Sequence, residues 1–222
     1  MSLQDKVLIL HGLARTARSM KKLAETIEQA GYEVLNFTYP SREYTIEELA
    51  AWLLPKVEEH LETATPLHFV SHSMGGLVGR ELMSLLPEHN WQSAVFIAPP
   101  NQGSQVARTL SSHPMTQSFF QWFYGPAGQQ VAGEIELPLP LCPFGVIAGT
   151  KKRALVNPTS WISHNIFPDD QSSDGTVAVH ETKLDKMVDF AELALDHTTI
   201  MNHPQIHRFV LHFFQHHAFP KD

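Results

Sequence analysis

Residues 67–78 read LHFVSHSMGGLV, and the interpretation of the whole chain starts from them. The apolar run predicts a strand, the two glycines predict the start of a helix, and Ser73 falls in the turn between the two. A sharp turn of this kind raises a serine hydroxyl above the edge of a sheet, and it requires small neighbours because its backbone is strained. Gly75 satisfies that requirement, whereas Ser71 occupies the position where the usual G-x-S-x-G pattern has its first glycine. We therefore predict that Ser73 is a nucleophile in a variant of this pattern.

The composition is that of an ordinary folded domain and argues against several classes of protein. Of the 222 residues, 43% are hydrophobic and 18% are charged, which suits one domain with a substantial core. The formal net charge of −7 argues against nucleic acids and anionic membrane surfaces as partners. One cysteine, Cys142, excludes an intramolecular disulfide and fits a reducing compartment. The N-terminus lacks the pattern of a secretory signal, and no apolar run approaches the roughly 18 residues of a spanning helix, so we expect a cytoplasmic protein without a membrane segment.

Strands and helices are expected to alternate along the chain. Thr45 followed by Glu48 resembles a capping box that opens a helix, and the last helix is predicted from about Pro204, where apolar residues recur at helical spacing. The expected strands cover residues 7–10, 33–37, 94–98 and 144–148, the start of 67–78, and, less regularly, part of 187–195. This alternation implies a three-layer α/β/α sandwich with a mostly parallel sheet of about six strands.

A long insertion, at about 101–141, interrupts the alternation after the fourth strand. We expect a single domain, 1–222, in which this insertion lies on the carboxyl side of the sheet, where ligands bind. Its aromatic side chains either fill a small core of the insertion itself or form a cap and acyl pocket above Ser73, and both can hold at once. These residues are Phe119, Phe120, Trp122, Phe123 and Tyr124.

A serine nucleophile needs a neutral imidazole to accept its proton and a carboxylate to orient that imidazole. The chain has 14 histidines, so the base must be chosen by its position. His72 adjoins Ser73, but neighbouring residues on a strand and turn project to different sides, which argues against it. A base is expected on a loop at the carboxyl edge of the sheet, after the last strand and before the last helix. His197 occupies that position and is the predicted base.

The carboxylate is expected on the loop that follows the preceding strand, which gives the chain order Ser, Asp, His. Asp174 fits best because it precedes a glycine and an apolar segment. Asp169 and Asp170 remain alternatives. Asp196 is next to His197 in the sequence and is poorly placed to reach its ring.

Acyl transfer places negative charge on an oxygen, and backbone N–H groups can stabilise that charge. We predict that the N–H of Met74, at the start of a helix, is one donor of this oxyanion hole. The N–H of Leu13 is the second, because the pair His11-Gly12 before it allows the backbone to approach closely.

Two pairs of histidines have the i, i+4 spacing of a metal site: His203 with His207, and His212 with His216. Neither pair is accompanied by the glutamate of H-E-x-x-H or by a cluster of further ligands. We therefore expect ordinary helix faces and predict no metal site.

Together these motifs resemble the α/β-hydrolase superfamily, in particular its small lipase- and esterase-like branch. The resemblance spans nearly the whole chain, which is expected to lack the early antiparallel strands of larger members. It implies a Ser-His-Asp hydrolase that works through an acyl-enzyme and needs no cofactor. The segments that carry it are 11–13, 71–76, 98–104, 174–175 and His197.

The predicted function is hydrolysis of a carboxylic ester, with a small-molecule or lipid acyl ester as the substrate. A thioesterase, an amidase or an acyltransferase would use the same triad. Outside enzymes, the alternative is a binding protein on a hydrolase fold, because the fold alone does not fix the function. If the substrate is a dispersed lipid, the aromatic insertion would be a mobile lid.

Overall fold

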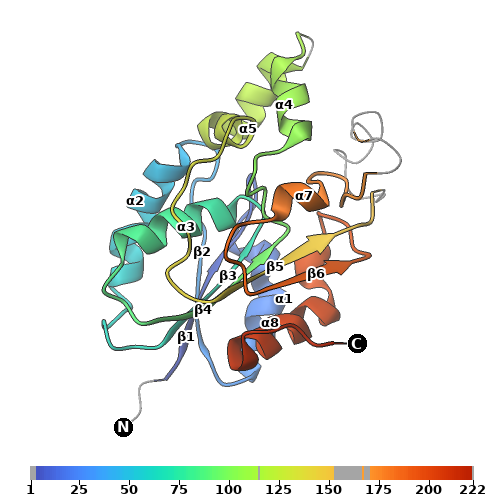
Figure 1. The fold of residues 1–222 in the computed structure, drawn as a ribbon. Helices are drawn as coiled ribbons and strands as arrows, with labels where there is room; N and C mark the ends of the chain where they lie inside the picture. Colours follow the sequence, from blue (N-terminus) through green and yellow to red (C-terminus); the bar gives the residue numbers. More distant parts are fainter. Residues whose placement is uncertain (1–3, 115, 153–166, 168–170, 222) are drawn as a thin grey trace.

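A six-stranded parallel sheet forms the centre of the structure (Figure 1). The structure is a computed structural model that describes residues 4–114, 116–152, 167 and 171–221, without the side chains of residues 119–121 and 123. The strands lie in the order β2-β1-β3-β4-β5-β6, and every neighbouring pair is parallel. They are β1 (Lys6–Leu10), β2 (Glu33–Phe37), β3 (Leu67–His72), β4 (Trp91–Ile97), β5 (Phe144–Gly149) and β6 (Asp189–Leu193). The predicted sandwich with a parallel sheet of about six strands is confirmed.

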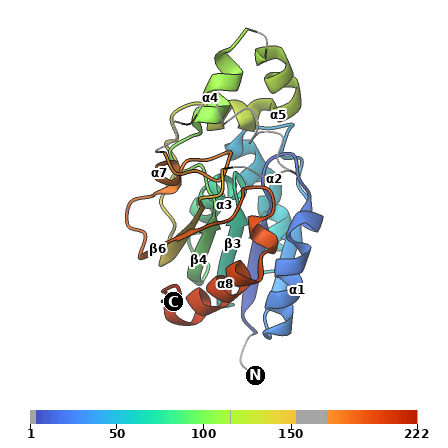
Figure 2. The ribbon, with the colours of Figure 1, turned by 90° about the vertical axis from the view of Figure 1, so that its right-hand side faces the viewer.

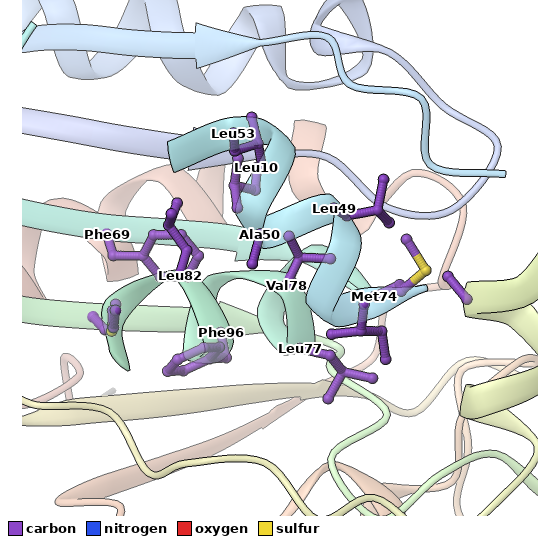
Figure 3. Close-up of a cluster of buried hydrophobic side chains, with 14 of the residues drawn as sticks. Leu10, Leu49, Ala50, Leu53, Phe69, Met74, Leu77, Val78, Leu82 and Phe96 are labelled. Carbon is purple, nitrogen blue, oxygen red and sulfur yellow. The ribbon is translucent and has the colours of Figure 1, made fainter. Parts of the chain in front are cut away.

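Apolar clusters on the two sides of the sheet hold the helices in place. Side chains alternate along each strand, so that Val7 faces one cluster and Leu8 the other. Helices α2 and α3 cover the side of Leu8, where Leu53 and Leu82 pack near Phe69 (Figure 3), and α1 and α8 cover the opposite side (Figure 2). Their bounds are α1 (Lys21–Gln29), α2 (Ile46–Glu58), α3 (Gly75–Leu85) and α8 (Pro204–His216). Among the described residues, no helix combines the length and the apolar composition needed to cross a membrane.

The helix predicted from the pair Thr45 and Glu48 begins where expected. The hydroxyl of Thr45 accepts the N–H of Glu48 at 3.2 Å, and the carboxylate of Glu48 accepts the N–H of Thr45 at 2.9 Å. This reciprocal pair satisfies two N–H groups that the helix itself leaves without partners. The described residues also form three short helices: η1 (Ala17–Met20), α7 (Val179–Thr182) and η2 (Ile200–Asn202).

The insertion after β4 contains two helices that the sequence did not predict, and both stand beyond one end of the sheet (Figures 1 and 2). They are α4 (Gln105–Ser112) and α5 (Gln117–Val131). Gly125 interrupts α5 with a φ of 64°. A Cβ atom at Gly125 would lie only 1.8 Å from the carbonyl oxygen of Arg42, and the N–H of Ala127 donates to the carbonyl of Tyr44 at 3.1 Å. The second half of α5 is therefore docked on the segment that precedes α2.

We expect Gly125→Ala to lower the free energy of unfolding by about 1–3 kcal/mol, the usual cost of overpacking. The added methyl group would overlap the carbonyl oxygen of Arg42, and alanine adopts a φ of 64° only with strain. Urea denaturation followed by circular dichroism measures the change. The matched control is Gly133→Ala in the same insertion, where the nearest atom would be 3.4 Å away and the change should stay within about 0.5 kcal/mol. Equal effects of the two substitutions would contradict this docking.

Candidate active site

Ser73 lies in the turn between β3 and α3 with a φ of 54°, a left-handed conformation that is costly for a residue other than glycine. Its N–H donates to the carbonyl of Ile97 at 2.8 Å, which fixes the turn to β4. A Cβ atom at Gly75 would lie 2.5 Å from the carbonyl oxygen of His11 and 2.7 Å from that of Leu10. Only glycine therefore allows α3 to start so close to the end of β1. This is the strained strand-to-helix turn expected around a nucleophilic serine.

Ser71, which replaces the first glycine of the usual pattern, is buried beneath the start of α3. A Cβ atom at Gly76 would lie 3.2 Å from the hydroxyl oxygen of Ser71, so the missing side chain at Gly76 leaves room for that hydroxyl. Among the described residues, the Ser71 hydroxyl has no hydrogen-bond partner. The departure from the pattern therefore fills space under the helix and adds no polar contact to Ser73.

Ser73, His197 and Asp174 form one chain of hydrogen bonds. The Nε2 atom of His197 is 3.0 Å from the Ser73 hydroxyl oxygen, and its Nδ1 atom is 2.7 Å from Oδ2 of Asp174. A carboxylate only accepts hydrogen bonds, so Nδ1 carries the ring proton and Nε2 can accept the proton of the serine hydroxyl. Asp174 is 1% exposed and His197 is 7% exposed. The structure thus brings together the three residues that the sequence singled out.

The loop that carries Asp174 is held in place by backbone groups. The Oδ1 atom of Asp174 accepts the N–H groups of Thr176 at 3.0 Å and Val177 at 2.8 Å. The main-chain carbonyl of Asp174 accepts the N–H of His197 at 3.1 Å. A Cβ atom at Gly149 would lie 2.7 Å from Cβ of Asp174. Glycine at the end of β5 therefore lets this loop approach the sheet.

The carboxylate of Asp196 accepts hydrogen bonds from its own turn and none from the ring of His197. It accepts the N–H groups of Thr198 and Thr199 at 3.0 and 3.1 Å, and the hydroxyl of Thr199 at 2.6 Å. The alternatives Asp169 and Asp170 lie outside the described residues.

The loop after β1 lies directly against the turn of Ser73. A Cβ atom at Gly12 would be 3.1 Å from Cβ of Ser73. In the described part of the chain, the N–H groups of Leu13 and Met74 donate to no protein acceptor.

His11 supports this loop as a neutral ring. Its Nδ1–H donates to the carbonyl of Gly12 at 2.8 Å, and its Nε2 accepts the N–H of Tyr39 at 3.3 Å. The rings of His11 and Tyr39 stack with their centroids 4.1 Å apart, and the Tyr39 hydroxyl donates to the His11 carbonyl. Burial lowers the pKa of His11 from 6.5 to about 4.

Two of the predicted cap residues have described side chains. Tyr124 is partly buried against the apolar cluster of α2 and α3, whereas Trp122 is 72% exposed. A Cβ atom at Gly128 would lie 3.3 Å from Cδ2 of Leu13, so the docked half of α5 borders the loop after β1. The side chains that lie outside the described part are those of Phe119, Phe120 and Phe123.

Sequence reasoning missed a buried cation that ties the insertion to α3. Arg80 is 2% exposed and donates to the carbonyls of Leu137 at 2.5 Å and Pro138 at 2.8 Å. It also donates to the side-chain oxygen of Asn101 at 3.2 Å. Burial lowers the pKa of Arg80 to about 10. An arginine within the otherwise apolar run GGLVGR was the signal available in the sequence.

A buried carboxylate, also missed, ties α7 to the start of α4. Glu181 is 1% exposed and accepts the N–H groups of Ala178 at 2.8 Å and Gln105 at 2.6 Å. It forms a 3.0 Å salt bridge with Arg108. Burial raises the pKa of Glu181, while these donors act in the opposite direction.

Three of the four histidines with metal-like spacing bond to other groups. The Nε2 of His207 is 3.0 Å from the carbonyl of Met201, and Nδ1 of His212 is 2.7 Å from the carbonyl of Ala218. The Nδ1 of His203 accepts a backbone N–H at the start of α8. Within the described residues, no group of three His, Cys, Asp or Glu side chains could hold a metal ion.

The parallel sheet, the serine turn and the two following loops define an α/β-hydrolase fold, and solved structures of a lipase and a thioesterase share it. The mature lipase BlEst2 of Bacillus licheniformis superimposes with a TM-score of 0.67 and 19% identity, covering 90% of this chain and 87% of that one. The type II thioesterase BorB from the borrelidin biosynthetic cluster superimposes with a TM-score of 0.59 and 16% identity, covering 99% and 96%. The resemblance noted from the sequence is confirmed.

The chain belongs to the family described as a domain of unknown function, DUF7379, which matches residues 2–135. A curated relative, the lysosomal thioesterase PPT2 homolog of Drosophila melanogaster, is 28% identical over 137 residues, which cover 57% of this chain and 47% of that protein. The chain therefore spans about half the length of the curated relatives it matches.

The neutral ring of His11 predicts a loss of stability in acid. Because the pKa of His11 falls from 6.5 in the unfolded chain to about 4 in the fold, the unfolded chain binds more protons between these values. The contribution of His11 is complete above pH 6.5 and is lost as the pH falls toward 4. We expect His11→Asn to reduce the difference in unfolding free energy between pH 7 and pH 5 by about 1–2 kcal/mol.

Urea denaturation at the two pH values measures this difference, and any loss common to both values cancels. The control is His60→Asn at an exposed histidine, which should leave the difference as in wild type. A wild-type difference in His11→Asn would show that His11 is not held neutral.

Proposed function

We propose that this chain is a serine hydrolase that cleaves carboxylic esters through an acyl-enzyme. The observation that carries the proposal is the continuous hydrogen-bonded chain from the Ser73 hydroxyl through His197 to the buried carboxylate of Asp174. The strained backbone at Ser73 adds support, because proteins retain such strain mainly at functional sites.

In this mechanism, the Ser73 oxygen attacks the carbonyl carbon while Nε2 of His197 takes its proton. Asp174 stabilises the imidazolium that forms. The imidazolium then gives its proton to the leaving alcohol, and an ester of Ser73 remains. Water attacks this acyl-enzyme with His197 again as the base, which releases the carboxylic acid and restores the serine.

The N–H groups of Leu13 and Met74 are proposed to hold the oxyanion of each tetrahedral intermediate. Support comes from the 3.1 Å approach that a Cβ atom at Gly12 would make to Cβ of Ser73. Rigid backbone donors of this kind stabilise charge without reorganising during the reaction.

We also propose that 101–141 acts as a cap within a single domain, 1–222. The docking of Gly125 on Arg42 and the bonds of Arg80 fix its base, while α4 and the first half of α5 extend beyond the sheet (Figure 1). Such a cap suits an acyl chain of a small-molecule or lipid ester as the substrate. A cytoplasmic location remains a prediction of the sequence.

Labelling with a serine-directed fluorophosphonate tests the nucleophile. We expect wild type to be labelled and Ser73→Ala to show none, with hydrolysis of p-nitrophenyl butyrate reduced by at least about 10⁴-fold. Ser71→Ala is the matched control, since it removes a buried hydroxyl without a described partner and should keep wild-type labelling. Absent labelling of folded wild type would favour the binding-protein alternative.

Thioester hydrolysis is the second candidate, because the curated relatives are named thioesterases. An oxyester and a thioester of the same acyl group separate the two. We expect the oxyester to give a kcat/KM at least equal to that of the thioester. A preference for the thioester of about 100-fold, near 2.7 kcal/mol of differential transition-state binding, would reassign the activity. An amide of the same acyl group tests amide hydrolysis, and an alcohol added to the ester assay tests acyl transfer.

A further inference from the structure

His72, the last residue of β3, is a buried histidine that the proposed mechanism does not use. Side chains alternate along β3, so His72 shares the face of Val70, on the side of α1 and α8, and not that of Phe69. It is 1% exposed. Its ring therefore lies inside the protein, directly behind the nucleophile turn.

The ring of His72 contacts the residue proposed as the base. Its Nε2 atom is 2.9 Å from the main-chain carbonyl oxygen of His197, and the centroids of the two rings are 4.8 Å apart. On its other side, a Cβ atom at Gly12 would lie 3.0 Å from Nδ1 of His72. One side chain thus touches the loop of the base and the loop after β1.

The proton on the His72 ring follows from these partners. A carbonyl oxygen only accepts, so Nε2 must donate, and the neutral ring then carries no proton on Nδ1. In the described part of the chain, Nδ1 is buried without a hydrogen-bond partner. Burial, and next the charge of a protonated His197, lower the pKa of His72 well below 6.5. His72 therefore remains a neutral donor.

The loop of His197 needs such a support because it comes from β6, which lies three strands away from β3. At about 4.8 Å per strand, the loop crosses roughly 14 Å to reach Ser73. The main chain of His197 is held on both sides of its Cα atom: its N–H donates to the carbonyl of Asp174 at 3.1 Å, and its carbonyl accepts from His72.

We propose that His72 is a positioning residue for His197, whose Nε2–H fixes the backbone of the base so that its ring meets both Ser73 and Asp174. The inference rests on the proposed function and adds a residue to it. The bond from His72 acts on the main chain, whereas Asp174 acts on the ring.

Glutamine and asparagine at position 72 distinguish the effect of the hydrogen-bond donor from the effect of the space that the His72 ring fills. The amide nitrogen of glutamine can reach the place of Nε2, whereas that of asparagine corresponds to Nδ1, and phenylalanine keeps a ring without a donor. We expect His72→Asn and His72→Phe to lower kcat for p-nitrophenyl butyrate by roughly 10- to 100-fold with little change in KM, since a small misplacement of a catalytic group costs this much. His72→Gln should stay within about threefold of wild type.

A second measurement does not depend on turnover. The proton that His197 shares with Asp174 should give a low-field NMR resonance in wild type and in His72→Gln, and it should be broadened or lost in His72→Asn. Thermal unfolding shows that each variant is folded. Wild-type kcat and resonance in folded His72→Asn, or a His72→Gln no better than His72→Asn, would overturn the inference.

Failure of the proposed function would give a different result. Wild type would then hydrolyse no ester and react with no fluorophosphonate, while the resonance would still distinguish His72→Gln from His72→Asn. That outcome would reject the hydrolase and support the positioning of His197 by His72.

Discussion

The structure depends on one close contact, between the start of α3 and the end of β1. Gly75 lies where any Cβ atom would overlap the carbonyls of Leu10 and His11, and Ser73 accepts a left-handed backbone just before it. These two conditions turn the chain from β3 into α3 within a few residues. They also lift the serine hydroxyl out of the sheet, toward loops that come from other strands.

The parallel sheet then determines which loops can meet Ser73. Carboxyl ends of all strands gather at one edge, so the loops after β1, β5 and β6 share it with the turn after β3. β4 separates β3 from β5, and its Ile97 carbonyl holds the N–H of Ser73. Glycine recurs at the contacts between these loops, at Gly12 and Gly149, because the backbones approach more closely than side chains allow.

Local patterns in the sequence predicted the strands, the capped start of α2, and the three residues that share hydrogen bonds. Ser73 was identified from its own turn, and Asp174 and His197 from the order of loops that a parallel sheet imposes. Helix α5 is not predicted because its aromatic run, followed by a glycine and a proline, has no helical period. The partners of Arg80 were hidden for another reason: Leu137 lies 57 positions away, and only the folded chain brings the two together.

The buried histidines near Ser73 are neutral, and their neutrality favours the positive charge that the proposed reaction places on His197. The proposed reaction makes His197 an imidazolium, and a second unit charge on the ring of His72, at 4.8 Å, would oppose it by about 3.5 kcal/mol at an effective dielectric constant near 20. Burial lowers the pKa of both His72 and His11, and the nearby Arg15 acts in the same direction. Both rings can therefore donate hydrogen bonds without bringing positive charge. The two histidines give rigid polar support, while Asp174 alone supplies the negative charge bonded to the ring of His197 among the described residues.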